Sequence, residues 1–591
     1  MEHPVLHVIV VGFHHKKGCI VEYAYPPLLP GKIKTVKMTN VKLFDVLTNY
    51  FLGGEGHSSE LPSQWKHLPS LALPDGSHNY DSDTAFFHLP DLENPRKTIF
   101  GISCYRQIAA ADVKNPTEKI TRGFVQKSVC VLSRLPLYGH IQVKMALITE
   151  AFFIEADFSR LDLIHQTYDN LNSCLTGDLV RTQQLYVGLS ARKLIQTLSH
   201  RTLVLFKLFL LERKVLFFQS PVMDLCSYFL TLLSLHPGML EDGLNESACS
   251  VPLDTPPESL SPELIEDRPY SSCSSVKSIS NANLEASATE NPGEQALNQR
   301  APSLTLTGAV TNEEVGLPLK VFGRGNLCLP YLSLSYIDTL SQPCIKGYMI
   351  GATNILFKQK SGMSEVIVDI EKDKIDILDP ELKKALHLTT EDLRFIDYLI
   401  KQVSNENNGS SDVFLDGVGW EGGDEWIRAQ FRLYLLCLLR SVLNSDQDPN
   451  ASYELNRFNS HFIHLWKKTM NYKLWREHVS NEAVDMESFI TLPPMHPCSG
   501  QYSLGDMRLH LSNTITNTEG GKKVTQALGN TGRAVAGSIS NAKGVFSSWM
   551  SSLKSNESKE TTANKDDKED KEEVIEDKSV DQVAQDAIVE S

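Results

Sequence analysis

The chain has 591 residues, of which 41% are hydrophobic and 22% charged, a composition typical of a soluble protein with two or three folded units. Its formal net charge is −15, concentrated in two acidic segments, residues 241–314 and 557–591, and opposed by a basic segment, residues 522–554. The rest of the chain is nearly neutral, so a broad basic face for nucleic acid is excluded and no nucleic-acid partner is expected.

The eleven cysteines are scattered without a C-x-x-C pair, which argues against a zinc ribbon and against a disulfide framework. No basic region precedes the first apolar run, so we expect no signal peptide. The most apolar stretch, Leu203–Leu235, is interrupted by Lys207, by Glu212 and its neighbours, and by Asp224, so we expect it to lie in a core rather than in a membrane. A cytoplasmic protein is the simplest interpretation.

Residues 4–178 are predicted to form one α/β unit. The β-branched run Val5–Val11 predicts a buried strand, and Cys19–Tyr25 alternates like a second strand after a polar turn. His14, His15 and Cys19 lie near that turn, but no fourth metal ligand is suggested nearby. Three further strands and two helices are expected, over Ala85–His88, Thr98–Tyr105, Val125–Ser133, Tyr138–Phe153 and Phe158–Cys174.

Residues 189–240 and 315–378 are predicted to form a second α/β unit. A helix over Leu194–Leu211, a buried strand over Lys214–Gln219 and a helix over Pro221–Leu235 are expected before residue 240. Residues 241–314 are rich in Ser, Pro, Asn and Glu, which predicts a disordered insertion. The strands that follow, Lys346–Ala352, Glu365–Ile370 and Lys374–Leu378, are expected to join Lys214–Gln219 in one mixed sheet across the insertion.

Residues 379–510 are predicted to be helical. The expected helices cover Pro380–Leu388, Thr390–Ser404, Asp424–Leu443 and Tyr453–His478, and Thr389 with Asp392 suits a capping start for the second of them. His461 and His464 lie three residues apart without a third ligand, so a structural role is preferred to a metal site.

The most distinctive stretch of the chain is a glycine-rich turn that precedes the helix at Asp424. Gly417-Val-Gly419-Trp-Glu-Gly422 matches G-x-G-x-x-G, yet no strand follows the helix as a dinucleotide fold requires, so a tight turn feeding a buried helix is preferred. Asp424 is expected to be the N-cap of this helix and to pair with Arg428 at i,i+4.

The basic segment, residues 522–554, repeats its apolar residues every eleven positions, which is three turns at about 3.67 residues per turn. Its many glycines oppose a helix in water, whereas its aromatic end suits a lipid surface. We expect an amphipathic membrane-binding helix here and a solvated acidic tail over residues 555–591; packing on the protein itself, or disorder, remains the alternative. The candidate membrane-binding residues are Lys522, Lys523, Val524, Leu528, Arg533, Val535, Ile539, Lys543, Val545, Phe546, Trp549, Met550 and Leu553.

Two long motifs carry a resemblance to a known family. GWEGGDEWIRAQF over Gly419–Phe431 and VIVVGFHHKKGCIVEYAYPPL over Val8–Leu28 resemble the Avl-nine family of late-secretory-pathway proteins, which is related to the DENN modules that act on Rab-type small GTPases. Lys32–Gly53 has no counterpart in the family pattern. The signature residues are Trp420, Gly422, Gly423, Asp424, Glu425, Trp426 and Arg428.

The resemblance implies a fold of class α/β, with a longin-like N-terminal module, a DENN-type central module and a helical C-terminal module. It implies a factor of the late secretory or recycling pathway, peripheral on membranes, that binds a Rab-type GTPase and promotes nucleotide exchange, or alternatively a non-catalytic scaffold or tether. No hydrolase, Walker A or zinc-protease motif occurs, so at most an exchange factor is expected, with no catalytic residues, metal or cofactor.

Overall fold

The computed structural model describes residues 3–29, 61–114, 123–248, 311–360, 362–404, 414–415, 419–481 and 492–500. All of them belong to one compact unit, residues 1–511. Lys32–Gly53, the candidate membrane helix of residues 522–554 and the acidic tail of residues 555–591 lie outside the described residues. Within the described part of the chain, no helix is long and apolar enough to cross a membrane.

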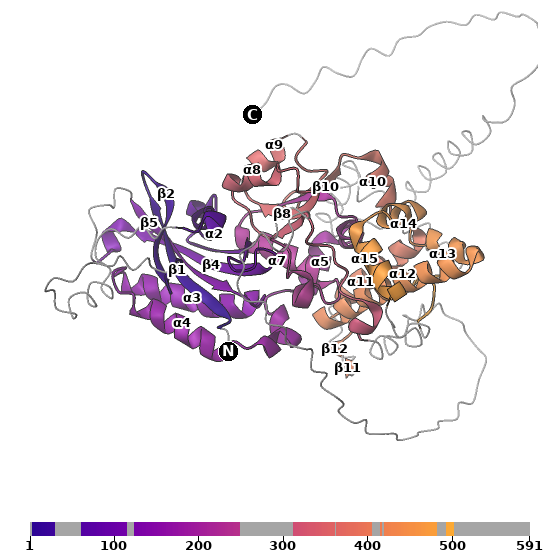
Figure 1. Ribbon diagram of the computed structural model, residues 1–591, viewed down its shortest axis with the longest axis horizontal. Coiled ribbons are helices and arrows are strands. Elements are labelled where there is room, and N and C mark those ends of the chain that lie inside the picture. Colours follow the sequence, from indigo (N-terminus) through magenta and orange to yellow (C-terminus); the bar gives the residue numbers. More distant parts are fainter. Residues whose placement is uncertain are drawn as a thin grey trace, which may run out of the picture. The chain divides into compact units, whose positions relative to one another are not determined.

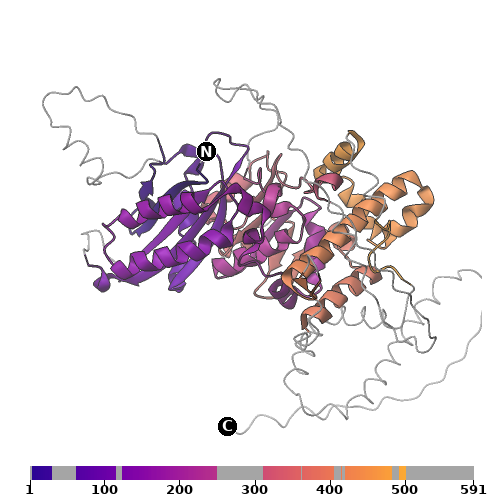
Figure 2. The same ribbon diagram turned by 90° about the horizontal axis from the view of Figure 1, so that it is seen from below.

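The N-terminal module is built on a five-stranded antiparallel sheet in the order β2-β1-β5-β4-β3. The apolar run that predicted the first strand is fully buried from Val8 to Val11, because helices cover the sheet. Helices α3 and α4 lie side by side against it (Figures 1 and 2). The elements are β1 (Val5–His14), β2 (Gly18–Tyr25), α2 (Leu68–Ala72), β3 (Ser82–Pro90), β4 (Thr98–Ala109), β5 (Phe124–Ser133), α3 (Tyr138–Glu155) and α4 (Asp162–Cys174).

The central module is built on a second sheet, in the order β10-β9-β6-β8-β7. β6 (Lys214–Phe218) pairs in parallel with β8 (Gly347–Ala352) and β9 (Val366–Asp369), while β10 (Lys374–Ile377) is antiparallel to β9. The predicted mixed sheet across the insertion is therefore confirmed. The other elements are α5 (Ala191–Leu198), α6 (Arg201–Phe209), α7 (Val222–Ser234), β7 (Asn326–Leu329), α8 (Ile337–Leu340) and α9 (Leu356–Gln359).

The helical module follows residue 379, as predicted. Thr389 and Asp392 form a reciprocal capping box, in which each backbone N–H donates to the other side chain at 3.1 Å. The elements are α10 (Pro380–Ala385), α11 (Thr390–Ser404), β11 (Phe414–Leu415), β12 (Gly419–Trp420), α12 (Asp424–Gln447), α13 (Ser452–Asn456), α14 (Ser460–Trp466) and α15 (Met470–Asn481). Short 3-10 turns lie at residues 63–65, 77–79, 110–112, 177–181, 183–186, 313–315, 334–336 and 449–451.

Two of the predicted helices are interrupted. Leu194–Leu211 was predicted as one helix, but the chain turns at Ser199, whose φ is +47°, and divides it into α5 and α6. Tyr453–His478 was likewise predicted as one helix and is three. Asn459 breaks it with a φ of +73°, which Asn tolerates better than most residues because its short polar side chain bonds locally.

The predicted insertion is too long at both ends. A π-helical turn over Met239–Gly243 continues the fold, and Leu244 is buried. The backbone N–H of Thr98 donates to Asn245 O at 2.8 Å, which fastens this segment to the N-terminal module. The described chain resumes at residue 311, so only residues 249–310 of the predicted insertion lie outside the described residues.

Three carboxylates join the modules by accepting hydrogen bonds at the N-terminus of a helix in another module. Asp83 on β3 accepts from Val222 and Met223 at the start of α7, at 3.0 and 2.9 Å. Asp424 accepts from the backbone of Arg192 in α5 at 2.7 Å. Glu212 accepts from Met470 and Asn471 in α15, at 2.9 and 2.7 Å. Each satisfies N–H groups that have no partner within their helix and places negative charge at the positive end of its dipole.

Candidate functional site

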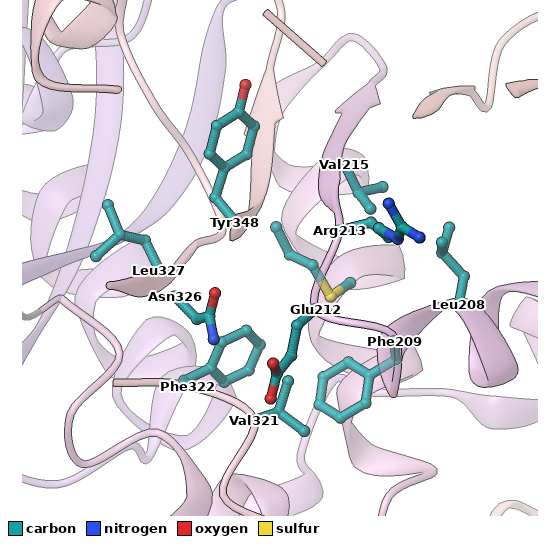
Figure 3. Close-up of a pocket in the computed structure, with 11 residues that line it drawn as sticks. Leu208, Phe209, Glu212, Arg213, Val215, Val321, Phe322, Asn326, Leu327 and Tyr348 are labelled. Atoms are coloured by element: carbon teal, nitrogen blue, oxygen red, sulfur yellow. The ribbon is translucent and has the colours of Figure 1, made fainter. Parts of the chain in front are cut away.

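The described residues hold no cluster of three or more His, Cys, Asp or Glu side chains that could bind a metal ion. An enclosed cavity lies between α6 and the central sheet, lined by Phe209, Glu212, Asn326 and Tyr348 among others (Figure 3). Its volume is about 10 Å³, which is room for one water molecule at most. This cavity is too small for a substrate, so it is not the candidate site.

The central sheet presents a candidate surface at the carboxyl ends of its parallel strands. Because β6, β8 and β9 run in the same direction, Phe218, Ala352 and Asp369 end at a common edge. Loops at this edge of an open α/β sheet are the usual place for ligand binding. The loops that follow β6 and β8 contain Gln219–Ser220 and Thr353–Leu356.

The N-terminal module contributes to the same edge through the loop that begins at Asp75. The carboxylate of Asp75 accepts hydrogen bonds from Leu334 N at 3.2 Å and Asn354 Nδ2 at 3.4 Å, and its carbonyl accepts from Thr353 Oγ1 at 3.1 Å. The hydroxyls of Tyr80 and Ser220 lie 2.9 Å apart. These bonds hold loops of two modules together as one surface.

Two large apolar side chains are exposed on this surface. Ile355 and Leu356, at the start of α9, expose 48% and 46% of their area. Close by, Lys358 forms an ion pair with Asp369 at 2.5 Å and lies over the Phe218 ring. Protein-binding surfaces combine an apolar centre with a polar rim, and this pair with its charged neighbours has that arrangement on a small scale. We call the residues Asp75–Tyr80, Gln219–Ser220 and Thr353–Leu356 the carboxyl edge.

The signature residues lie elsewhere, in the joint between the central and helical modules. Asp424 is the first residue of α12 rather than its N-cap, which is Gly423, so that prediction was wrong. The Asp424 carboxylate instead accepts from Arg192 N and from Ser190 Oγ, at 2.7 and 3.1 Å, because α5 presents its N-terminus there.

Arg428 bonds to the central module as well. Its guanidinium donates to Leu189 O at 2.6 Å and Ser234 Oγ at 3.1 Å and lies 4.4 Å from the centroid of the Tyr186 ring. The direct contacts of both side chains are therefore with the helices around α5 and α7. The predicted Asp424–Arg428 interaction persists as a charge effect, because burial lowers the pKa of Arg428 and the Asp424 carboxylate opposes that shift. Tyr186 in turn donates to the buried carboxylate of Glu241.

The remaining signature residues shape the turn before α12. Gly422 has a φ of +87°, and a Cβ atom there would lie 2.8 Å from Gln402 O, so both conformation and space require glycine. Trp426 is buried against Tyr398, whereas Trp420 exposes 60% of its area; Gly423 is buried and Glu425 is half-buried in the first turn of α12. The signature is thus a structural joint between the central and helical modules.

The sequence reasoning missed a buried polar cluster in the same joint. Lys207 Nζ donates to Asp392 Oδ2 at 2.7 Å and Phe458 O at 2.9 Å, and Tyr434 donates to Asp392 Oδ1 at 2.7 Å. His496 completes the cluster, with Nε2 3.3 Å from Asp392 Oδ1. The signal was the single charge of Lys207 inside an apolar run, because a buried lysine needs a partner. Ile355 and Leu356 carried no sequence signal. The candidate membrane-binding residues of 522–554 lie outside the described residues.

The chain is similar to a known protein family and to two yeast proteins. A family model described as "Transport protein Avl9" matches residues 5–442. Late secretory pathway protein AVL9 of Saccharomyces cerevisiae is 29% identical over 549 residues, and the match covers 86% of this chain and 62% of that protein. Late secretory pathway protein avl9 of Schizosaccharomyces pombe is 27% identical over 517 residues, covering 85% of this chain and 91% of its own. The match spans under two thirds of the first relative's length, but the family model matches most of this chain. The chain belongs to the Avl9 family.

Proposed function

We propose that this protein is a membrane-trafficking factor of the late secretory or recycling pathway that binds a Rab-type small GTPase at the carboxyl edge. The names of its yeast relatives support the pathway. Its resemblance to DENN modules supports the GTPase, because that resemblance assigns the Rab-facing surface to the place where the central strand ends beside a helix. In this chain that place is the end of β6 before α7. The protein would act in the cytoplasm, peripheral on a membrane.

The exposed pair Ile355 and Leu356 is the observation that carries this proposal. Its surface is held in place by Asp75, whose bonds to Thr353, Asn354 and Leu334 join two modules. A surface already fixed before binding loses little conformational entropy when a partner docks. Such a surface suits a folded protein partner rather than a small substrate.

Nucleotide exchange is compatible with this surface and needs no acid–base pair. An exchange factor has only to bind the nucleotide-free GTPase more tightly than the loaded one, since a ligand shifts an equilibrium by its differential affinity for the two states. We propose exchange as the activity and non-catalytic scaffolding as its alternative.

A binding assay with purified protein and a panel of Rab proteins, each nucleotide-free, GDP-bound and GTP-bound, tests the proposal. Ile355→Glu with Leu356→Glu should weaken binding by at least about tenfold, because it places two charges in an apolar contact. Val143→Glu with Leu147→Glu, at exposed positions on α3, is the matched control and should bind normally. Retention of no Rab protein in any state, or equal loss in both variants, would contradict the proposal. Faster nucleotide release from a bound Rab separates exchange from scaffolding.

The alternative function, a tether docked by residues 522–554, has its own test. A peptide of that segment should be disordered in buffer and helical on small anionic vesicles, since its glycines oppose a helix in water while Phe546 and Trp549 insert into lipid. Circular dichroism measures the change. Phe546→Ala with Trp549→Ala should remove most of it, and a peptide that stays disordered with vesicles present contradicts the tether.

A further inference from the structure

An open groove in the helical module lies between α10 and the helices α13 and α14, which are neighbours in Figure 1. We propose that it binds a ligand bearing several phosphate groups, such as a phosphoinositide headgroup. We call it the basic groove. Its volume is about 670 Å³, within the usual range of ligand sites. It is lined by Pro380, Lys383, Lys384, His387, Thr389, Asn456, Asn459, Ser460 and His461.

The floor of the basic groove is fixed by Asn459. Its amide nitrogen donates to the carbonyls of Lys384, Ala385 and His387 at 2.9, 3.1 and 2.9 Å, and its Oδ1 accepts from His461 N at 3.0 Å. These bonds satisfy the carbonyls at the C-terminal end of α10, which would otherwise present negative partial charge to an anion. They also fix the end of α10 against the start of α14, which form the two walls of the groove.

Five of the polar side chains that line the groove have no partner within the described part of the chain. Lys383, Lys384, His387, Ser460 and His461 are exposed and take part in no side-chain hydrogen bond or ion pair with another described residue. Two ammonium groups, two imidazoles and a hydroxyl therefore remain free for a ligand, and all can donate hydrogen bonds to phosphate oxygens.

Several acidic residues flank the basic groove, but none of them is among its lining residues. Glu391 and Glu454 both pair with Arg457, at 3.6 and 3.0 Å. Asp379 accepts from Glu381 N at the start of α10, and neither of these two residues lines the groove. The lining itself carries a formal positive charge, because it contains two neighbouring lysines and no acid.

The lining also narrows the class of ligand. The only aromatic rings in it are two imidazoles, so the large aromatic platform on which a nucleotide base usually stacks is not among the lining residues. A phosphorylated inositol ring needs no such platform, because its charged groups surround a polar ring. The same chemistry occurs in a membrane phosphoinositide and in a soluble inositol polyphosphate.

The test uses the full chain with Phe546→Ala and Trp549→Ala in the background, which removes the proposed lipid contact of residues 522–554. Binding is measured to inositol hexakisphosphate in solution, and to phosphatidylcholine vesicles carrying either phosphatidylinositol bisphosphate or phosphatidylserine at equal charge. Lys383→Gln with Lys384→Gln should weaken binding by about thirtyfold at low salt, since each lysine at an anionic surface contributes about a factor of five. Lys16→Gln with Lys17→Gln, an exposed lysine pair in the β1–β2 turn, is the matched control.

Binding of hexakisphosphate and of bisphosphate vesicles, lost in the groove variant alone, supports a headgroup site. Binding of the soluble compound without the vesicles supports the same site with a soluble ligand. The proposal is overturned if neither hexakisphosphate nor the bisphosphate vesicles bind, if phosphatidylserine vesicles bind equally well, or if the groove and control variants lose binding equally.

Discussion

The ammonium group of Lys207 lies 2.7 Å from the carboxylate of Asp392, and neither side chain has any exposed surface. Lys207 comes from α6 of the central module and Asp392 from α11 of the helical module. The pair is enclosed by further donors and acceptors, and the ammonium lies 4.9 Å from the centroid of the Phe462 ring. Burial raises the pKa of Asp392, but Lys207 and His496 outweigh it and hold that pKa below its usual range.

Removal of the lysine should therefore be costly. Lys207→Met leaves the Asp392 carboxylate buried without its counter-ion and should destabilise the protein by about 3–5 kcal/mol. Lys193→Met removes an exposed pair with Asp224 and should change stability by less than about 1 kcal/mol. Urea denaturation followed by fluorescence measures the stability of both variants. Equal midpoints for the two would contradict the stabilising role of the buried Lys207–Asp392 pair.

Part of the pH dependence of the free energy of unfolding should come from His88. Its Nδ1 lies 2.7 Å from Cys328 O and its Nε2 2.5 Å from the Tyr138 hydroxyl, in a fully buried position between two modules. Burial lowers the pKa of His88 to about 3 despite the bond to Cys328. As the pH falls below about 6.5, only the unfolded state takes up this proton, so stability is lost, by about 2 kcal/mol at pH 5.

His88→Asn keeps a donor for Cys328 O and removes the titrating group. The stability lost between pH 7 and pH 5 should be smaller in this variant by about 2 kcal/mol, as measured by urea midpoints at both values. Other buried histidines, such as His496, whose pKa burial also lowers, contribute equally to both proteins and cancel in the comparison. Parallel losses in the two proteins would contradict the neutral state of His88.

The signature glycines should differ in their tolerance of a side chain. Gly422→Ala forces a Cβ to 2.8 Å from Gln402 O at a positive φ and should cost about 1–3 kcal/mol. Gly423→Ala, at a φ of −76° and with its nearest backbone neighbour at 3.1 Å, should cost less. Thermal melting of the two single variants ranks them, and the reverse order would refute the geometric argument.

The boundaries of the insertion give a fourth prediction. Replacement of residues 250–310 by a short Gly/Ser linker should leave the melting temperature within about 4 °C of the parent, because loop length changes stability slowly. A deletion of residues 241–314 should lower it further, since it removes Asn245 and Ser247, which bond to Thr98, and Glu241, which accepts from Tyr186. Equal melting temperatures for the two variants would contradict the conclusion that residues 241–248 and 311–314 belong to the fold.

The strands could be predicted because they are encoded locally. Val5–Val11 and Lys214–Gln219 are apolar runs bounded by polar turns, and the observed β1 and β6 contain or nearly match them. The break at Ser199 could not be predicted, because the apolar pattern of Leu194–Leu211 continues through it and the left-handed conformation depends on packing in three dimensions.

The candidate site was predictable only in part. The strand of Lys214–Gln219 was predicted. The contact between Asp75 and Thr353 beside its end was not, because these two residues are far apart in the sequence and meet only in the folded chain. The role of Asp424 was misread for the same reason. Its local sequence is that of an N-cap, whereas the amide it accepts from belongs to Arg192.

The three carboxylates that join the modules also bear on the synthesis of the chain. Arg192 emerges from the ribosome 232 residues before Asp424, and Glu212 emerges 258 residues before Met470. Until the later partner is made, the start of α5 lacks this acceptor and the Glu212 carboxylate is left to water. The central module of a nascent chain therefore lacks these contacts until the last helices have been translated. A chain that ends before Asp424 cannot form the bond between Arg192 and Asp424.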